Sequence, residues 1–358
     1  ALLFSPYHLI PGGGERYLFT LGIALEKAGY QVYFAAPDNV SRTRLRNLGR
    51  DLNLALDNIV PVNWKRAQSM TRLALQVTMG NEVIPPVPGI ADRNIYHCQF
   101  PFDMSEELVA NNSLYLQSYE KVIVNSEFTR GNYLQRLQRY QHENKIVQVI
   151  DPPCPLINIT ADQIAQKKPW ILNVGRFFTG GHQKKQHVAI DVFKRLIDAE
   201  PDLVGKGAQL HLAGSLSPVQ EHREYVELLK RQAVGYPIHF HVNVSNEELN
   251  QLYRDSLVYW HFTGWGEDIE RHPELFEHFG ISVVEAISAG LVPIVPAAAG
   301  PGEILGRLGQ LTAYTELKHL LKNTSDVLDS KVDASLHDKL VRMKESAGAF
   351  SEDAFIRK

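Results

Sequence analysis

Basic side chains flank one loop of the chain, where they could bind an anion together. Arg176 follows the apolar run 170–174, and Lys184 and Lys185 come eight and nine residues later, at the start of a predicted helix. In a parallel sheet, ligands bind beyond the carboxyl ends of the strands, so this loop can aim both kinds of side chain at one ligand. Arginine binds a phosphate through two parallel hydrogen bonds, and lysine binds it as a point charge. The spacing predicts a clamp for a diphosphate, although a solvated basic turn also has this pattern when it is considered alone.

Two glutamates further along the chain are spaced to face one ligand. Glu277 and Glu285 are separated by seven residues, and Gly280 precedes a predicted helix that contains Glu285. Eight positions along a helix make just over two turns, which brings both carboxylates to one side. The N–H groups at the start of that helix are suited to phosphate. The alternative is a loop acid and a solvated helix residue, but the residues around Glu285 are apolar, so its carboxylate needs a partner.

A glycine-rich loop and a histidine are the candidates in the first half of the chain. Gly12, Gly13 and Gly14 follow the first apolar run and open a predicted helix. Glycines let the backbone approach a ligand closely, so the loop is predicted to cradle a phosphate or a polar acceptor, or else to be a flexible turn. The spaced glycines of a dinucleotide-binding fingerprint are absent. His97 ends another predicted strand, where its role is either structural or functional.

These residues are positioned by apolar strand-like runs that alternate with helix-like segments along the whole chain. Such alternation with short connections predicts an α/β fold with parallel sheets covered by helices. The expected strands are 1–5, 31–36, 59–62, 94–97, 121–125 and 146–150, and then 170–174, 210–213, 238–242, 258–262 and 292–295.

A proline-rich segment divides this alternation into two parts of similar size. Residues 151–155 contain three prolines, which remove hydrogen-bond donors and fix φ, and residues 151–169 are expected to form a linker. We therefore expect a first domain at 1–155, a second at 156–340, and a helical tail at 341–358 that packs near the first domain. A cleft between two such domains is the expected ligand site.

Composition excludes several classes of protein. The 358 residues are 44% apolar and 22% charged with a net charge of −3, which excludes a disordered chain and a broadly basic nucleic-acid binder. Two cysteines are no disulfide framework, so we expect a reducing, cytoplasmic location. The apolar stretch 281–300 contains Glu285 and two prolines and is not expected to span a membrane. Residues 1–150 carry 15 basic and 13 acidic residues, a slight excess that allows peripheral contact with an anionic membrane.

The order and spacing of the motifs resemble those of glycosyltransferase family 4. The matching residues are Gly175, Arg176 and Phe177; Lys185 and Gln186; Glu277 and Glu285 with Phe279 and Gly280; Ala289, Gly290 and Pro293; and Gly300, Pro301, Gly302 and Glu303. The glycine-rich loop followed by Glu15 and Arg16 resembles mannosyltransferases of that family that extend lipid-linked oligosaccharides. The resemblance implies the GT-B fold, in which two Rossmann-like domains face a central cleft. It also implies a retaining hexosyltransferase that uses a nucleotide-sugar donor and a glycan or lipid-linked acceptor, as in polysaccharide biosynthesis.

The resemblance also implies roles for single residues. Arg176 and Lys185 would neutralise the donor diphosphate. Lys185 fits this role better than Lys184, which we expect to be dispensable, because Lys185 directly precedes Gln186. Glu277 would bind the donor sugar, and His97 would lie near the reacting atoms. The expected donor-binding residues are Gly13, Gly14, Val242, Phe279, Gly280, Ile281 and Glu285, with Glu285 on the ribose.

Two departures from the family pattern leave the donor open. His278 stands where the family usually has glycine, and the link 263–273 before Glu277 is longer than usual. A UDP-hexose such as UDP-glucose is favoured, and GDP-mannose is the other donor considered. No Asp-x-Asp dyad and no His/Cys cluster at ligand spacing is found, so neither a metal nor another cofactor is expected. The alternatives are a nucleotide-sugar epimerase on the same fold and a non-catalytic polysaccharide-assembly protein.

Overall fold

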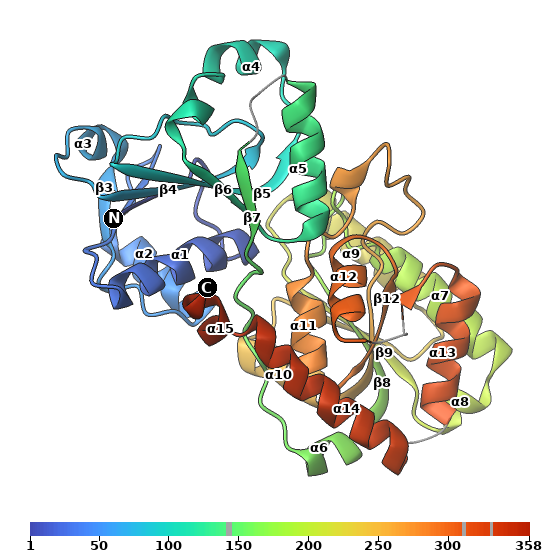
Figure 1. The fold of residues 1–358 in the computed structure, drawn as a ribbon. Helices are drawn as coiled ribbons and strands as arrows, with labels where there is room; N and C mark the ends of the chain where they lie inside the picture. Colours follow the sequence, from blue (N-terminus) through green and yellow to red (C-terminus); the bar gives the residue numbers. More distant parts are fainter. Residues whose placement is uncertain (141–144, 310–312, 330–331) are drawn as a thin grey trace. The chain divides into compact units, whose positions relative to one another are not determined.

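The computed structural model describes residues 1–140, 145–309, 313–329 and 332–358, which form two α/β units (Figure 1). The first unit contains residues 1–153 and 352–358, and the second contains 154–351. The chain passes between them two residues before the predicted boundary at 155. Both cysteines are buried thiols that form no disulfide, Cys98 in the first unit and Cys154 in the second.

The first unit is built on a parallel sheet with the strand order β3-β2-β1-β4-β5-β6-β7. Helices α1 and α2 pack on one face of this sheet, and α3 and α5 pack on the other (Figure 1). The strands are β1 (Leu2–Phe4), β2 (Tyr33–Ala36), β3 (Val60–Asn63), β4 (Leu75–Glu82), β5 (Arg93–Phe102), β6 (Lys121–Val124) and β7 (Ile146–Val149). The helices are α1 (Gly13–Lys27), α2 (Arg42–Leu52), α3 (Trp64–Gln68), α4 (Glu106–Asn112), α5 (Glu127–Arg139) and the short η1 (Tyr115–Ser118).

The two faces of strand β1 illustrate why this segment folds as a buried strand. Leu3 belongs to the apolar cluster under α1 and α2, whereas Leu2 and Phe4 belong to the cluster on the opposite face. Successive side chains of a strand point to opposite faces, so a continuous apolar run fits a strand covered on both sides. Helix α1 lies close to β1 because it carries Gly22, where a Cβ atom would come within 2.8 Å of Leu3 Cδ1.

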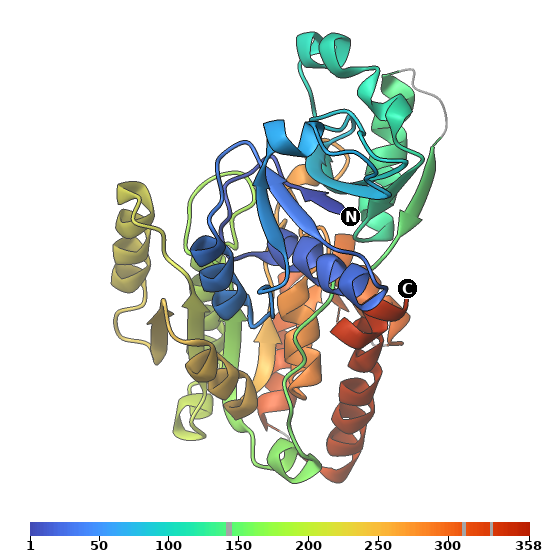
Figure 2. The same ribbon diagram turned by 90° about the vertical axis from the view of Figure 1, so that its left-hand side faces the viewer.

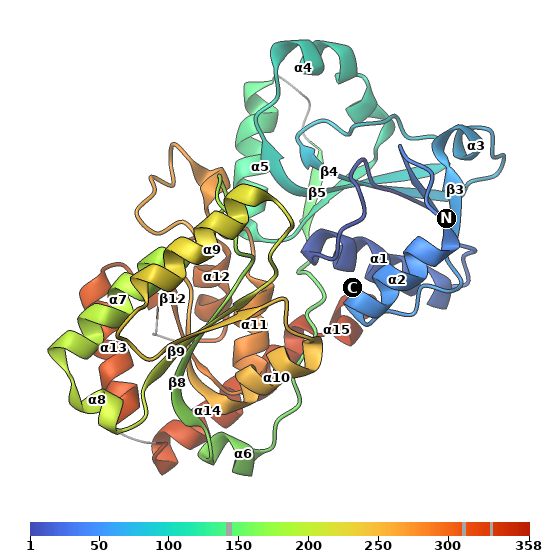
Figure 3. The ribbon, with the colours of Figure 1, turned by 180° about the vertical axis from the view of Figure 1, so that it is seen from behind.

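The second unit is built on a parallel sheet with the strand order β10-β9-β8-β11-β12-β13, and Figure 2 shows β10, drawn in gold, at its edge. Helices α7 and α9 pack side by side (Figure 3), and α11 packs with α14. The strands are β8 (Lys168–Val174), β9 (Gln209–Gly214), β10 (Ile238–Val242), β11 (Ser256–Trp260), β12 (Val292–Pro296) and β13 (Ala313–Tyr314). The helices are α6 (Ala161–Ala165), α7 (Gln186–Ala199), α8 (Asp202–Gly205), α9 (Gln220–Gln232), α10 (Asn246–Asp255), η2 (Pro273–Leu275), α11 (Ile281–Ser288), α12 (Ala299–Arg307), α13 (Leu317–Asp329), α14 (Ala334–Ser346) and η3 (Ala347–Phe350).

The C-terminal segment divides between the units later than predicted. Helix α14 contributes Leu340 and Met343 to the second core, and the chain leaves that unit only after Ser351. The last helix, α15 (Glu352–Arg357), belongs to the first unit, where Phe355 packs edge-on against Tyr17 at a centroid distance of 4.9 Å. The expected tail at 341–358 is therefore too long, because residues 341–351 belong to the second unit.

Phe355 is expected to stabilise α1 as well as α15, because it is 6% exposed and lies in one cluster with Tyr17. Phe355→Ala should remove about 3 kcal/mol of stability from this part of the first unit, which corresponds to roughly hundredfold faster amide exchange in α1. Asp353→Ala, an exposed change in the same helix, is the control and should leave exchange unchanged. Unchanged α1 exchange in Phe355→Ala would show that α15 does not support the first unit.

Candidate donor site and first-unit loop

The loop after β8, which carries Arg176, is fixed by close backbone contacts. Gly214 lies so near this loop that a Cβ atom on it would be 1.9 Å from the carbonyl oxygen of Gly175. Gln186, the first residue of α7, donates Nε2 hydrogen bonds of 3.1 Å to the carbonyl oxygens of both Gly175 and Arg176. The position of the Arg176 backbone is thus set by the neighbouring strand and by the following helix.

The Arg176 side chain itself is exposed. Its guanidinium lies 5.1 Å from the centroid of the Phe178 ring, a cation–π distance. Among the described residues, no carboxylate forms an ion pair with Arg176. This arginine is therefore not occupied by a carboxylate of the described residues, and its role at a diphosphate stays a prediction.

Lys184 forms a buried ion pair with Glu277. The distance from Lys184 Nζ to Glu277 Oε2 is 2.5 Å, and the two side chains are 15% and 14% exposed. Burial by itself would raise the pKa of the Glu277 carboxyl. Lys184 and, after it, His261 lower this pKa by more than burial raises it, so the pKa lies well below its usual range. Loss of Lys184 would leave a buried carboxylate without its cation, so this geometry gives Lys184 a structural role that the sequence does not indicate.

Three histidines surround this ion pair, and only His278 among them is indicated by the sequence. His261 Nε2 lies 3.3 Å from Glu277 Oε2, and His182 Nε2 donates a 2.8 Å hydrogen bond to the carbonyl oxygen of Phe276. The rings of His182 and His278 stack with their centroids 4.8 Å apart. Burial lowers the pKa of all three, that of His182 to about 4, so the imidazoles are neutral at pH 7. The histidines therefore add hydrogen-bonding groups around Glu277 without adding charge.

Lys185 points to a different element from Lys184. Its Nζ lies 2.6 Å from Glu267 Oε1 and also donates a hydrogen bond to the carbonyl oxygen of Trp265. Lys185 is the N-cap residue of α7 and has a left-handed backbone with φ of 52°. The predicted phosphate-binding lysine is therefore held by the loop 263–273 in this structure.

Glu285 has the partner that its apolar surroundings require. The Tyr253 hydroxyl, on α10, donates a 2.9 Å hydrogen bond to Glu285 Oε2, on α11. The end of α10 is fixed in turn by Lys167, whose Nζ donates to the carbonyl oxygens of Tyr253, Arg254 and Ser256 at 2.9–3.0 Å. The sequence indicates the need for a partner but not its identity, because Tyr253 is 32 positions away on another helix.

The start of α11 is formed by residues with special backbone requirements. Gly280 has φ of 110°, a conformation that favours glycine, and Ile281 is the first residue of the helix. The Phe279 ring packs edge-on against Phe350, and a Cβ on Gly300 would lie 2.3 Å from the Phe279 backbone. Because the first N–H groups of a helix have no partner within it, this turn can bind an anion. Val242 is half-buried at the end of β10.

In the first unit, Gln99 rather than His97 lies at the glycine-rich loop. Gly13 begins α1, and a Cβ on Gly14 would collide with the side-chain amide of Gln99. His97 is 1% exposed and stacks on Tyr17 at a centroid distance of 3.8 Å. Burial lowers the pKa of His97 to about 3. His97 therefore packs in the core under α1, and its role near the reacting atoms stays a prediction.

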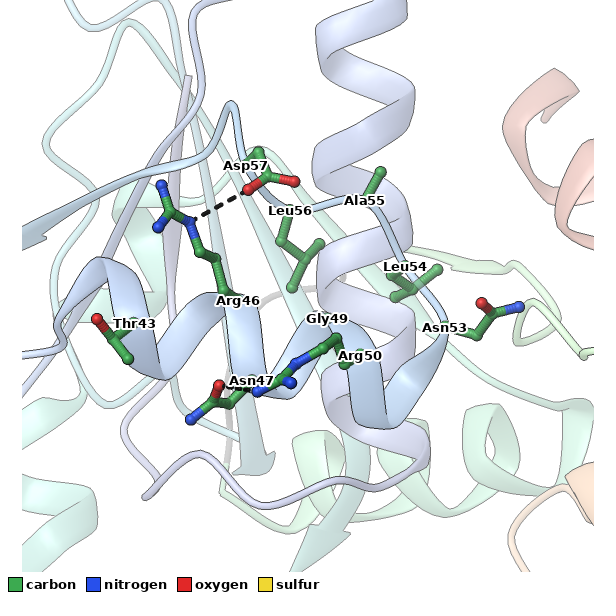
Figure 4. Close-up of a pocket in the computed structure, with 10 residues that line it drawn as sticks. All are labelled: Thr43, Arg46, Asn47, Gly49, Arg50, Asn53, Leu54, Ala55, Leu56 and Asp57. Carbon is green, nitrogen blue, oxygen red and sulfur yellow. Dashed lines mark hydrogen bonds and ion pairs between the residues drawn. The ribbon is translucent and has the colours of Figure 1, made fainter. Parts of the chain in front are cut away.

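A separate pocket of the first unit is formed by α2 and the loop that follows it (Figure 4). Arg46 pairs with Asp57 at 3.3 Å, and Arg50 donates a hydrogen bond to Asn47. The pocket thus contributes two exposed arginines but none of the residues singled out from the sequence. Within the described part of the chain, no three His, Cys, Asp or Glu side chains are grouped to hold a metal ion.

The Lys184–Glu277 pair makes stability depend on pH in a predictable direction. Lys184→Met should cost about 3 kcal/mol of unfolding free energy at pH 7.5, because Glu277 keeps its charge in a buried site. The wild-type Glu277 pKa is depressed, so its carboxylate stabilises the fold above pH 4.5 and loses that effect as the pH falls. In the variant, Lys184 no longer lowers the pKa of Glu277, while burial still raises it. Glu277 or the neighbouring His261 should therefore take up a proton more readily, and the loss of unfolding free energy should be smaller at pH 5.5 than at pH 7.5.

Lys168→Met is the control for this experiment, because Lys168 pairs with Asp255 at 3.1 Å and the two side chains are 49% and 25% exposed. Its cost should stay below about 1 kcal/mol at both pH values. Denaturant titrations of both variants provide the measurement. Equal losses for Lys184→Met at pH 7.5 and pH 5.5 would show that Glu277 does not depend on Lys184 for its charge.

One curated relative that matches this chain is the mouse (Mus musculus) protein named GDP-Man:Man(3)GlcNAc(2)-PP-Dol alpha-1,2-mannosyltransferase. The two are 25% identical over 202 residues, which cover 54% of this chain and 37% of the mouse protein. The chain therefore spans little more than a third of the length of that relative.

Solved structures match over nearly the whole chain. The Anabaena HepE protein in complex with UDP-glucose has a TM-score of 0.67 and 15% identity, over 99% of this chain and 97% of that one. The Escherichia coli structure titled trehalose-6-phosphate bound with UDP-2-fluoro glucose has a TM-score of 0.66 and 12% identity, over the same shares of the two chains. At these identities the likeness shows the fold, which is GT-B.

The sequence of the second unit provides the family assignment. Residues 158–346 match the profile described as Glycosyl transferases group 1. This segment includes β8 to α14, and hence Arg176, both lysines and both glutamates of the candidate donor site. It covers just over half of the chain, and the chain belongs to the glycosyl transferases group 1 family.

Proposed function

We propose that this protein is a retaining glycosyltransferase of family 4 that transfers a hexose from a nucleoside diphosphate sugar to a lipid-linked saccharide or another glycan. The observation that carries the proposal is the donor half-site, in which Arg176, Lys185 and the first turn of α11 belong to one unit with Glu277 and Glu285. Curated relatives from five organisms have names that specify GDP-Man. GDP-mannose is therefore the first donor to test, and UDP-glucose, which the sequence favoured, is the second.

The proposed chemistry requires stabilisation of a leaving diphosphate. The bond from the anomeric carbon to the diphosphate oxygen breaks, a bond to the acceptor oxygen forms, and the acceptor proton leaves with the diphosphate. Negative charge grows on the diphosphate as its bond breaks, and cations or N–H groups that meet this charge lower the barrier. Arg176, Lys185 and the first N–H groups of α11 have this proposed role. Glu277 would bind the sugar hydroxyls.

Glu285 is proposed to bind the ribose hydroxyls of the donor. Its carboxylate is held by the Tyr253 hydroxyl, which orients it on α11. Phe279, Gly280 and Ile281 would contribute backbone groups to the sugar and phosphate, and Val242 would pack on the base. This assignment separates residues that bind the nucleoside from those that bind the diphosphate, so the two groups can be tested independently.

In the first unit, we propose that Gly13 and Gly14 approach the donor sugar and the acceptor. Gln99 lies against Gly14 and is the polar side chain that this loop presents beside the glycines. Its amide can donate and accept hydrogen bonds, as sugar hydroxyls require. Gln99 thus joins His97 in the proposal as a polar side chain of the first unit on the acceptor side.

We also propose that the first unit contacts an anionic membrane from the cytoplasmic side, where a lipid-linked acceptor would be found. Helix α2 carries four exposed arginines, and Arg46 and Arg50 line the pocket in Figure 4. Basic side chains near an anionic surface contribute about 1 kcal/mol each to binding. Across the described ranges, every helix is too short or too polar to cross a bilayer.

The proposed activity predicts release of nucleoside diphosphate that depends on donor and acceptor. We expect GDP release from GDP-mannose, or UDP release from UDP-glucose, to continue in excess EDTA, because Arg176 and Lys185 supply the positive charge. Arg176→Ala should lower turnover about hundredfold, and Arg176→Lys should restore it only in part because the two-pronged hydrogen bonding is lost. A coupled assay for the nucleoside diphosphate measures both. Loss of turnover in EDTA that Mg²⁺ restores would refute the metal-free mechanism, and wild-type turnover in Arg176→Ala would refute the clamp.

The ribose assignment predicts graded losses of nucleotide affinity. Glu285→Ala should weaken nucleoside diphosphate binding about tenfold or more, because hydrogen bonds to a carboxylate contribute roughly 1.5–3 kcal/mol. Tyr253→Phe should weaken it less, since Glu285 remains but loses its orienting hydrogen bond. Tyr259→Phe is the control, because the Tyr259 hydroxyl bonds Ser282 on the same helix at 2.8 Å rather than Glu285. Calorimetry that gives equal affinities for wild type and Glu285→Ala would exclude a role in ribose binding.

A further inference from the structure

We propose that Glu267 is a positioning residue that holds the Lys185 ammonium when the donor site is empty and competes with the diphosphate for it. Donor binding would then exchange one anion on Lys185 for another, and product release would reverse the exchange. The inference rests on the proposed role of Lys185 in binding the diphosphate, and it assigns a function to the unusually long link 263–273.

The contact itself is close and largely desolvated on the lysine side. Lys185 Nζ lies 2.6 Å from Glu267 Oε1, and the Trp265 carbonyl oxygen accepts a second hydrogen bond from the same ammonium. The Lys185 side chain is 9% exposed, whereas that of Glu267 is 31% exposed. A buried ammonium needs an anionic or strongly polar partner, and the partly exposed carboxylate can exchange this contact for water at lower cost.

The loop that presents Glu267 has a defined fold. The Trp265 ring packs on Tyr314 at a centroid distance of 5.1 Å. Gly264 has φ of 84°, and a Cβ there would collide with the Phe276 ring. The Glu267 N–H donates a 3.1 Å hydrogen bond to the carbonyl oxygen of Gly264. Because the backbone on both sides of Trp265 is fixed, the carboxylate of Glu267 is placed at Lys185 by the loop rather than by chance contact.

The charges around the proposed diphosphate site explain why this contact matters. Lys184 is neutralised by Glu277, and the three surrounding histidines are neutral at pH 7. The proposed diphosphate clamp consists of Arg176 and Lys185. While Lys185 is paired with Glu267, Arg176 has no carboxylate partner among the described residues. A diphosphate can therefore use the full charge of Lys185 only when Glu267 gives up the contact.

The exchange is suited to a transfer reaction because the charge of the bound nucleotide changes. The donor carries a sugar on its terminal phosphate, and the released nucleoside diphosphate carries an additional ionisable oxygen there. Lys185 would hold the product more tightly than the donor, since an ion pair strengthens with charge. A carboxylate that returns to Lys185 offsets this gain and speeds release of the product.

The test uses the full chain with Glu267→Gln and, as the matched control, Glu270→Gln, which removes an exposed glutamate from the same loop. Calorimetry measures binding of GDP and of guanosine, or of UDP and uridine if the wild type prefers uridine. Glu267→Gln should bind the nucleoside diphosphate about tenfold more tightly than wild type and the nucleoside equally well. Glu270→Gln should match wild type for both ligands. In turnover, Glu267→Gln should show correspondingly stronger inhibition by the nucleoside diphosphate product.

Two further variants separate the possible outcomes. In a Lys185→Met background, Glu267→Gln should no longer change the affinity for the nucleoside diphosphate, because the two residues act as a pair. Unchanged or weaker diphosphate binding in Glu267→Gln overturns the inference, and parallel weakening for the nucleoside identifies a purely structural role. If Glu267→Gln fails to fold, Glu267→Asp replaces it. The inference is overturned if Glu267→Asp binds the nucleoside diphosphate with the same affinity as wild type at every salt concentration. If wild type binds neither GDP nor UDP, the proposed function itself fails, and the inference fails with it.

Discussion

Two neighbouring lysines of the second unit are largely buried, and the need to neutralise them organises the candidate donor site. Lys184 is paired with Glu277 and Lys185 with Glu267, at 2.5 and 2.6 Å. Desolvating an ammonium is costly unless a carboxylate or several carbonyl oxygens replace water. The positions of both acidic residues, one before α11 and one in the link 263–273, therefore depend on the single turn that precedes α7.

This turn can serve both carboxylates only because the backbone around it is closely packed. Gly175 and Gly214 bring the ends of β8 and β9 together, and Gln186 bonds the carbonyl oxygens of the same loop. Gly300 allows α12 to approach the backbone of Phe279, just before α11. A side chain on Gly214 or Gly300 would collide with a neighbouring backbone, and one on Gly175 would collide with the Lys184 side chain, so the glycines fix the distance between the elements that carry charge. The packed backbone thus determines where the charged residues lie, and the ion pairs determine which lysine contacts which carboxylate.

Much of this arrangement is predictable from the sequence, and the exceptions have physical causes. Alternating apolar runs predict the two parallel sheets, but β4 is missed because it buries Gln76 and Thr78, whose hydrogen bonds to each other and to Tyr119 form only in the fold. The spacing of the motifs selects Arg176 and both glutamates. Contacts between distant segments are not encoded in spacing, which is why the partners Tyr253, His261 and Glu267 are found only in three dimensions. The sequence indicates His97 but not Gln99, because only the fold shows that Gln99, two residues further along β5, lies beside the glycine-rich loop while His97 is buried against Tyr17.

The backbone at one residue explains how adjacent lysines acquire different roles. Lys185 has a left-handed backbone, so its side chain diverges from that of Lys184 and reaches another element. Lys184 meets a carboxylate that is 14% exposed and that His261 also approaches, so this pair is surrounded on several sides. Lys185 meets one that is 31% exposed, on a loop with access to water. An ion pair whose acid is enclosed cannot dissociate without a large desolvation cost, whereas one whose acid can be hydrated exchanges partners readily. The chain thus places a fixed ion pair and an exchangeable one side by side.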